Sequence, residues 1–255
     1  MNHSFDWVGR APTVERAGMQ GQEKTEDSLI REIRELRDRI AELDRLAVAH
    51  RMTEQALAQS LEKLRRATGV VIDVIIMAVE TRDPYTAGHQ NRVADLARSI
   101  AAEMRLPADV IDGIRVAGRI HDVGKISIPA EVLTRPRHLS PAEYSLVKTH
   151  PEIGYEILKN IDFTHPVAQM VYQHHERMNG SGYPRGLSGE AIMPEARILA
   201  VADVVEAICS RRSYRSALGI EKALKEILQY RDVLYDGEAV DACVALFRDR
   251  GFRFK

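Results

Sequence analysis

Apolar residues recur every four and three positions along the first quarter of the chain, which is the spacing of a coiled coil. The seam begins at Leu29, is interrupted by the polar residues His50 and Glu54, and ends at Leu64. Because two apolar positions in seven form a narrower stripe than a helix lying on its own domain usually has, the pattern favours a parallel homodimeric coiled coil over a single amphipathic helix. The apolar seam residues are Leu29, Ile33, Leu36, Ile40, Leu43, Ala47, Leu57, Leu61 and Leu64.

From Gly69 onward the apolar positions keep a helical period, and strand signals are nearly absent. The most apolar stretch, 70–79, is about half a membrane span and has Asp73 in its middle, so we expect a core helix and not a membrane anchor. The fold class is therefore predicted to be all-α, a helical-bundle domain preceded by a long N-terminal helix. Helices are expected over 70–80, 89–104, 108–119, 141–147, 166–176, 195–210, 220–230 and 238–250.

These patterns divide the chain into three expected parts. Residues 1–24 are polar and aperiodic, which indicates a disordered tail. Residues 25–68 are expected to form the coiled-coil helix for dimerisation and signalling, and residues 69–255 the helical domain.

Composition narrows the partners and the compartment. The formal net charge of −1 gives no overall field that would attract polymeric nucleic acid or an anionic membrane. Cys209 and Cys243 form no metal-binding or redox motif, and no signal-peptide pattern opens the chain. A cytoplasmic location without a membrane span is therefore expected.

Histidines and carboxylates of the kind that bind metals recur between residues 121 and 203. Side chains of this kind, placed inside or just beyond apolar helical stretches, are hard to explain as solvated surface, and they predict one metal centre. Because the set contains no thiolate, iron or manganese is favoured over a structural tetrahedral zinc. The set is His121 and Asp122, followed by Gly124 and Lys125, and then His150, His174, His175 and Asp203.

Six short motifs together resemble those of the HD-GYP family, in order and spacing, over about residues 69 to 230. They are Glu80–His89, His121–Ile126, Lys148–Pro151, His174–Glu176, Gly182–Pro184 and Val201–Asp203. That family is a subgroup of the HD phosphohydrolases, all-α domains that hydrolyse the bacterial second messenger cyclic di-GMP at a metal cluster. The resemblance implies that Asp122 bridges two metals and that the ligands are His89, His121, Asp122, His150, His174, His175 and Asp203.

Three further residues are expected to act on the substrate. Lys125 lies one helical turn beyond Asp122, where its ammonium can stabilise charge on a phosphate, so we expect both residues to be catalytic. Tyr183, in a glycine-rich loop, offers a phenol to phosphate or a ring face to guanine. Arg212 resembles the first arginine of the family's Arg-Pro-Tyr-Arg segment, a phosphate contact, although Ser213 replaces the proline.

The number of metals depends on Tyr85. Some relatives have a glutamate at this position, four residues before the first ligand histidine, and it helps to hold a third metal. A phenol is a poor ligand at neutral pH, so two divalent ions are expected. Two metals that share a carboxylate can neutralise phosphodiester charge and generate hydroxide at neutral pH.

The resulting interpretation is a metal-dependent phosphodiesterase in bacterial signalling. It would hydrolyse cyclic di-GMP to the linear dinucleotide, with a second step to GMP left open, as a homodimer with protein signalling partners. One alternative keeps the metals but changes the chemistry to another HD-type phosphohydrolase activity or to oxygen chemistry at a di-iron pair. The other alternative is a nonenzymatic module that senses cyclic di-GMP and relays its occupancy along the coiled coil.

Overall fold

The computed structural model describes residues 25–82, 87–135, 138–210 and 217–254. The chain divides into two units, residues 1–63 and 64–255, and each is considered by itself. No strand is present among the described residues, so the predicted all-α class is confirmed. None of their helices is long and apolar enough to cross a membrane.

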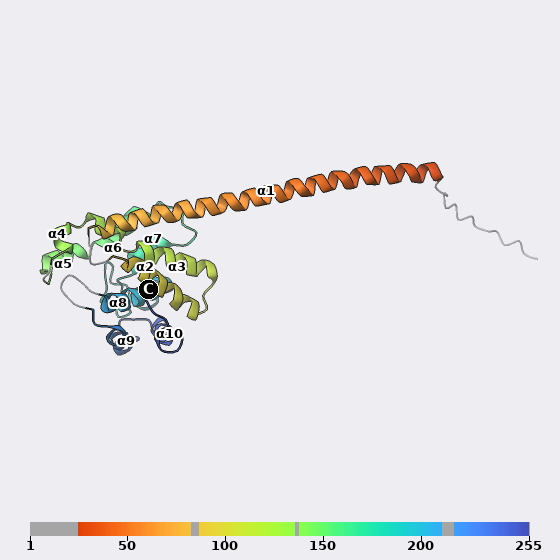
Figure 1. Cartoon of the computed structure of the whole chain (residues 1–255). Coiled ribbons are helices and arrows are strands. Elements are labelled where there is room, and N and C mark those ends of the chain that lie inside the picture. The colour runs from red at the N-terminus through yellow and green to blue at the C-terminus, as the bar shows by residue number, and fades with distance from the viewer. Residues whose placement is uncertain (1–24, 83–86, 136–137, 211–216, 255) are drawn as a thin grey trace, which may run out of the picture. The chain divides into compact units, whose positions relative to one another are not determined.

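Helix α1 extends from Glu26 to Glu80 and belongs to both units (Figure 1). It passes through Gly69 without a break. In the first unit every described residue of this helix is exposed, including the apolar seam residues Leu36 and Leu43. The coiled coil therefore stays a prediction, because its partner helix would have to come from another chain.

The expectation that 70–79 forms a core helix is only partly right. Ile76 and Val79 are buried, whereas Val70, Val71 and Met77 are each more than half exposed. The physical reason is that α1 contacts the domain along one face only, so the apolar residues on its other faces are left in contact with solvent.

The second unit is a bundle of short helices (Figure 1). Its core is centred on α2, α3 and α8, where Val93, Ile100, Ile114, Leu199 and Val205 are fully buried. After α1 the elements are α2 (His89–Glu103), α3 (Ala108–Ile120), η2 (Val123–Ser127), α4 (Ala130–Leu133), α5 (Pro141–Val147), α6 (His150–Leu158), α7 (Val167–Gln173), η3 (Gly189–Ala191), α8 (Pro194–Cys209), α9 (Ile220–Gln229) and α10 (Gly237–Arg248).

Local sequence signals explain where several of these helices begin. Ser140 caps α5: its hydroxyl accepts the Glu143 amide at 3.3 Å, and the Glu143 carboxylate accepts the Ser140 amide at 2.8 Å. Pro194 is the first residue of α8, where a helix needs no hydrogen bond from its backbone nitrogen. These ends agree with the sequence pattern.

The pattern did not predict α6, the helix that begins with His150. Pro151 and Gly154 interrupt its apolar period and are poor helix formers in general. Pro151 is tolerated because it lies in the first helical turn. Gly154 is required by packing, since a Cβ atom there would lie 2.9 Å from the Val171 side chain.

Gly124 allows η2 to lie directly against α6. A Cβ atom at Gly124 would be 2.0 Å from the His150 carbonyl oxygen and 2.7 Å from the Gly154 nitrogen, both backbone atoms that cannot rotate away. This glycine therefore sets the distance between the segment that carries Asp122 and the helix that begins with His150.

We expect Gly124→Ala to lower the free energy of unfolding by about 1–3 kcal/mol or more, because the backbone of α6 must move to admit a methyl group. Urea denaturation of the metal-free protein measures it. Gly69→Ala is the matched control: a Cβ atom there meets nothing within 4 Å inside α1, so this change should be neutral or stabilise by about 0.5–1 kcal/mol. Equal losses in both variants would contradict the packing argument.

Candidate metal centre

The seven predicted ligands come from five helical segments and meet in one place. Six of the side chains are buried, and that of His175 is half-buried. Their ligand atoms form three groups, each with all atoms within 4.8 Å of one another. The groups are His150, His174 and His175; His89, His121 and Asp203; and His121, Asp122 and His174.

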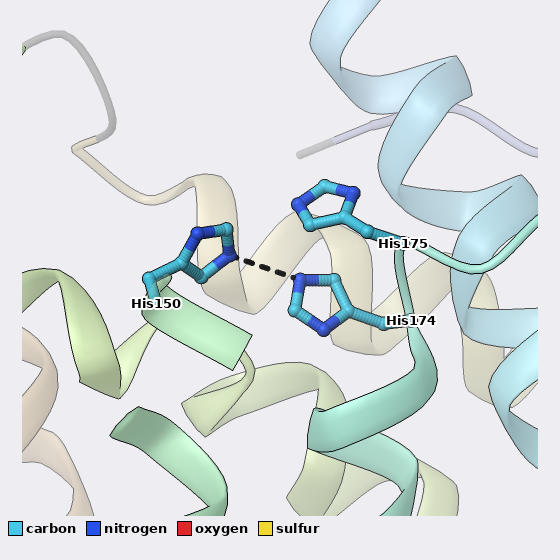
Figure 2. Close-up of side chains that lie close together, drawn as sticks. All are labelled: His150, His174 and His175. Atoms are coloured by element: carbon cyan, nitrogen blue, oxygen red, sulfur yellow. Dashed lines mark hydrogen bonds between the residues drawn. The ribbon is translucent and has the colours of Figure 1, made fainter. Parts of the chain in front are cut away.

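Helix ends position most of these side chains. His89 and His150 are the first residues of α2 and α6, and His121 follows the last residue of α3. Figure 2 shows the ring of His150 facing those of His174 and His175, which lie just beyond α7. The sequence pattern extended this helix to Glu176, but it ends at Gln173. The imidazoles of His174 and His175 both reach the group that contains His150.

Three of the histidines have their Nδ1 atoms fixed by a carbonyl oxygen three residues earlier in the chain. A carbonyl oxygen only accepts hydrogen bonds, so Nδ1 carries the hydrogen and the lone pair remains on Nε2. That Nε2 atom is the one directed at the centre. The pairs are His121 with Gly118 at 2.8 Å, His150 with Val147 at 2.8 Å, and His174 with Val171 at 2.6 Å.

The Nε2 atoms of His150 and His174 lie 3.3 Å apart, the contact drawn as a dashed line in Figure 2. Burial lowers the pKa of His150 to about 4 and holds the pKa of His174 well below its usual range. Both rings are therefore neutral at pH 7, and two nitrogen lone pairs face each other. A cation between them would turn this repulsion into attraction, so the residues fit a divalent metal ion.

Asp122 lies between two groups of histidines. Its Oδ1 atom is 3.4 Å from His150 Nε2, while its Oδ2 atom is 3.5 Å from His121 Nε2 and 3.9 Å from His89 Nε2. Burial raises the pKa of Asp122, but Lys125 and the surrounding imidazoles outweigh burial and hold it well below its usual range. An ionised carboxylate with one oxygen toward each group is what a bridging ligand requires.

Asp203 belongs to the group on the His89 side. Its Oδ1 atom is 3.3 Å from His89 Nε2 and 3.9 Å from His121 Nε2. Burial raises the pKa of Asp203, but its hydrogen bond with His89 and the charges of nearby imidazoles lower it more, so the carboxyl stays ionised at neutral pH. The centre thus contains two anionic side chains.

Lys125 contacts this centre directly. Its Nζ atom lies 2.8 Å from Asp122 Oδ2, and only 15% of its side chain is exposed. The ammonium is therefore held beside the carboxylate between the two histidine groups, at the edge of the site.

Glu206 is a functional candidate that the sequence reasoning missed. It is fully buried, contacts His89 Nδ1 through one carboxylate oxygen, and receives Arg92 Nε at 2.8 Å on the other. A carboxylate behind a ligating histidine fixes the ring and raises its basicity. The signal was present: Asp203 and Glu206 are three residues apart, hence on one face, and are the only charged residues between 198 and 209.

The glycine-rich loop packs against the second histidine of the pair. The rings of Tyr183 and His175 have centroids 4.7 Å apart, and a Cβ atom at Gly182 would lie 2.5 Å from the His175 carbonyl oxygen. Buried Glu176, also missed, accepts the backbone amides of Arg185 at 2.8 Å and Leu187 at 2.9 Å. These contacts hold Tyr183 beside the centre, where burial raises the pKa of its phenol.

Three sequence predictions concern residues that lie outside the described part of the chain. These are the disordered tail at 1–24, the phosphate contact at Arg212 and the effect of Tyr85 on the number of metals. All three stay predictions.

We expect Glu206→Gln to lower metal affinity about 10-fold to 100-fold, because the neutral amide keeps the size of the side chain but removes the charge behind His89. Competition with a chelator measures this affinity. Glu103→Gln is the matched control, since Glu103 pairs at the surface with Arg250 at 3.0 Å. Equal metal affinity in both variants would show that Glu206 does not act on the centre.

We expect the metal-free protein to lose stability as pH falls from about 6.5 to about 4. Unfolding returns His150 from a pKa of about 4 to its ordinary 6.5, so in this window the unfolded chain binds more protons than the folded chain. Stability from His150 is fully present above pH 6.5, and roughly 3 kcal/mol of it is lost by pH 4. Urea denaturation of chelator-treated protein at pH 7 and 4.5 tests this, and equal stabilities would contradict a neutral buried ring.

Comparison with known proteins places this geometry in a family. The HD domain family matches residues 73–239. The chain is 39% identical over 191 residues to "Cyclic di-GMP phosphodiesterase response regulator RpfG" of Xanthomonas campestris, an alignment that covers 74% of this chain and 50% of that protein. It is 38% identical over 147 residues to "3'3'-cGAMP-specific phosphodiesterase 3" of Vibrio cholerae, covering 57% of this chain and 32% of the relative.

A solved structure has a similar fold. It is a cyclic GMP-AMP specific phosphodiesterase of Vibrio cholerae, V-cGAP3, with a TM-score of 0.52 and 20% identity over 70% of this chain and 49% of that one. The chain spans half the length of the first relative and about a third of the second. Family match, relatives and motifs agree, and the chain belongs to the HD domain family.

Proposed function

We propose that this protein is a metal-dependent phosphodiesterase that opens the ring of cyclic di-GMP in bacterial second-messenger signalling. One observation carries the proposal: the neutral imidazoles of His150 and His174 lie buried beside the ionised carboxylate of Asp122. Nitrogen and oxygen donors combined in this way bind divalent metals. The HD domain match and a relative named as a cyclic di-GMP phosphodiesterase support it further.

The proposed centre would hold two divalent ions, iron or manganese, and Asp122 directs one carboxylate oxygen toward each group of histidines. His89, His121 and Asp203 would hold one ion, and His150, His174 and His175 the other, in line with two of the groups of close ligand atoms. Bound in this way, the ions supply charge neutralisation and an activated water for phosphodiester hydrolysis. Nitrogen and oxygen donors without thiolate support iron or manganese.

The chain's own residues have separate proposed roles at the phosphate. Asp122 would offer one carboxylate oxygen to each of the two ions, since its oxygens lie near His150 and His121 respectively. Lys125 places a positive charge beside Asp122, where charge on a nonbridging phosphate oxygen would be stabilised. Tyr183, held against His175, presents a neutral phenol or a ring face to the nucleotide, and Arg212 is proposed as a phosphate contact on the motif alone.

A second cyclic dinucleotide is a specific alternative substrate. One relative is named for 3'3'-cGAMP and is 38% identical, nearly as similar as the relative named for cyclic di-GMP. Cyclic di-GMP is favoured because the alignment with the relative named for it covers 74% of this chain, whereas the alignment with the relative named for 3'3'-cGAMP covers 57%. The two nucleotides differ in one base, so selectivity would depend on contacts to the base and not on the metal centre.

The same proposal includes the organisation of the chain. Residues 25–68 form a parallel dimeric coiled coil that connects the enzyme to signalling partners, after a tail at 1–24 and before the domain at 69–255. The exposed apolar seam of α1 supports the coil. A cytoplasmic location is proposed because cyclic di-GMP is an intracellular messenger.

We expect metal-loaded protein to convert cyclic di-GMP to the linear dinucleotide, and Asp122→Asn to reduce hydrolysis to background and to release at least one metal. The amide keeps the shape but cannot supply an anion to two cations. Separation of the products and elemental analysis measure the two effects.

Asp95→Asn is the matched control, because Asp95 is an exposed carboxylate on α2. It should leave both metal content and rate unchanged. Full turnover by metal-counted Asp122→Asn protein would refute the proposed role of Asp122. Preferential hydrolysis of 3'3'-cGAMP in the unchanged protein would favour the alternative substrate.

A further inference from the structure

The heptad spacing does not stop at Leu64. Counting on by four and three residues gives Thr68, Val71, Ile75 and Ala78, all within the same unbroken helix α1. Val71 is 58% exposed and Ile75 39% exposed, so the continued seam presents apolar side chains to solvent. The stretch 70–79 was expected to be a core helix, but packing against the domain leaves Val71 and Ile75 exposed.

The neighbouring face of the same turns is already occupied. Ile76 and Val79 are only 6% and 3% exposed, and Ile72 packs against the domain core. The helix therefore has one face that belongs to the domain and, beside it, a face carrying Val71 and Ile75. Within the described chain, that second face is left exposed.

Charges beside the seam indicate what covers it. In a parallel two-stranded coil, the residue just before every second seam position, here Ile33 and Ile40, faces the residue five positions later on the partner helix. Glu32 would face Arg37 of a second copy, and Arg39 would face Asp44, so both pairs are attractive. At the equivalent positions nearer the domain, Val74 is 59% exposed, whereas Val79 is 3% exposed because it packs against its own domain, so only the two charged pairs bear on the partner. These pairs favour a parallel second copy of this chain.

We propose that the last turns of α1, residues 68–78, pair in parallel with the same turns of a second copy, so that the dimer seam reaches the metal-binding domain. The inference rests on the coiled coil proposed for residues 25–68 and extends it past the expected boundary. Burying Val71 and Ile75 in each copy supplies the apolar contact that their own domain does not give them.

This pairing brings the dimer contact close to a ligand segment. Ile75, Ile76 and Val79 line a small cavity together with Asp122 and Val123. The same two turns of α1 would thus contact both the second copy and the Asp122 segment, with the partly covered Ile75 at the boundary between the two contacts. Pairing would hold α1 firmly where it supports that segment.

Cysteine cross-linking tests the register with a matched pair of positions. Val71 lies on the seam and Val70 does not, although both are valines and are 58% and 61% exposed. In a parallel dimer two Val71→Cys side chains meet at disulfide distance, so diamide should cross-link them at least about tenfold faster than Val70→Cys. The unchanged chain controls for the native cysteines, of which Cys243 is buried.

Leu43→Cys tests the coiled coil of residues 25–68 separately from its extension over residues 68–78, because Leu43 lies on the seam well before the domain. Rapid cross-linking at both 43 and 71 supports the inference. Cross-linking at 43 with equal rates at 70 and 71 overturns it, because the seam then ends before the domain. No cross-linking at either seam position overturns it together with the coiled coil. Cyclic di-GMP hydrolysis, measured on the reduced variants, tests the proposed enzyme independently of these outcomes.

Discussion

Buried lone pairs that face one another set the main constraint on this helical domain. His150 and His174 turn their Nε2 atoms toward each other at 3.3 Å, and Asp122 adds a buried carboxylate beside them. Such groups repel unless a cation lies among them, and burial removes the water that would screen them. The fold holds them in place through carbonyl oxygens at Nδ1, through Glu206 behind His89, and through the glycine that lets η2 approach α6.

The sequence predicted which residue types meet, but not how each is held. The histidine and carboxylate motifs indicated the ligand set, and the helical period of the apolar positions indicated the all-α class. The bounds of α5 agree with its capping signals. Helix α6 was missed because Pro151 and Gly154 break its apolar period, and only their contacts explain them. Glu206 was missed because it lies outside the six motifs, although a carboxylate within an apolar helix is buried only where it has a partner.

His175 shows where helical geometry alone is insufficient. Adjacent positions on a helix point about 100° apart, which makes it hard for His174 and His175 to serve one ion. Helix α7 ends at Gln173, although His174 keeps helical backbone angles, so the backbone alone does not decide where the two rings point. The ring centroids of His174 and His175 lie 4.1 Å apart, and both residues belong to the group with His150. The end of a short helix is set by packing, which the apolar period of one segment does not specify.

Tyr183 has a consequence for how pH dependence in this domain should be interpreted. Its ring lies against His175, and burial raises the pKa of the phenol above its ordinary value. The side chain therefore remains protonated through neutral and moderately alkaline pH, so it can stack or exchange hydrogen bonds but cannot supply a phenolate as base or ligand. An alkaline limb in a pH–rate profile would consequently report another group, such as bound water or an ammonium, and not this tyrosine.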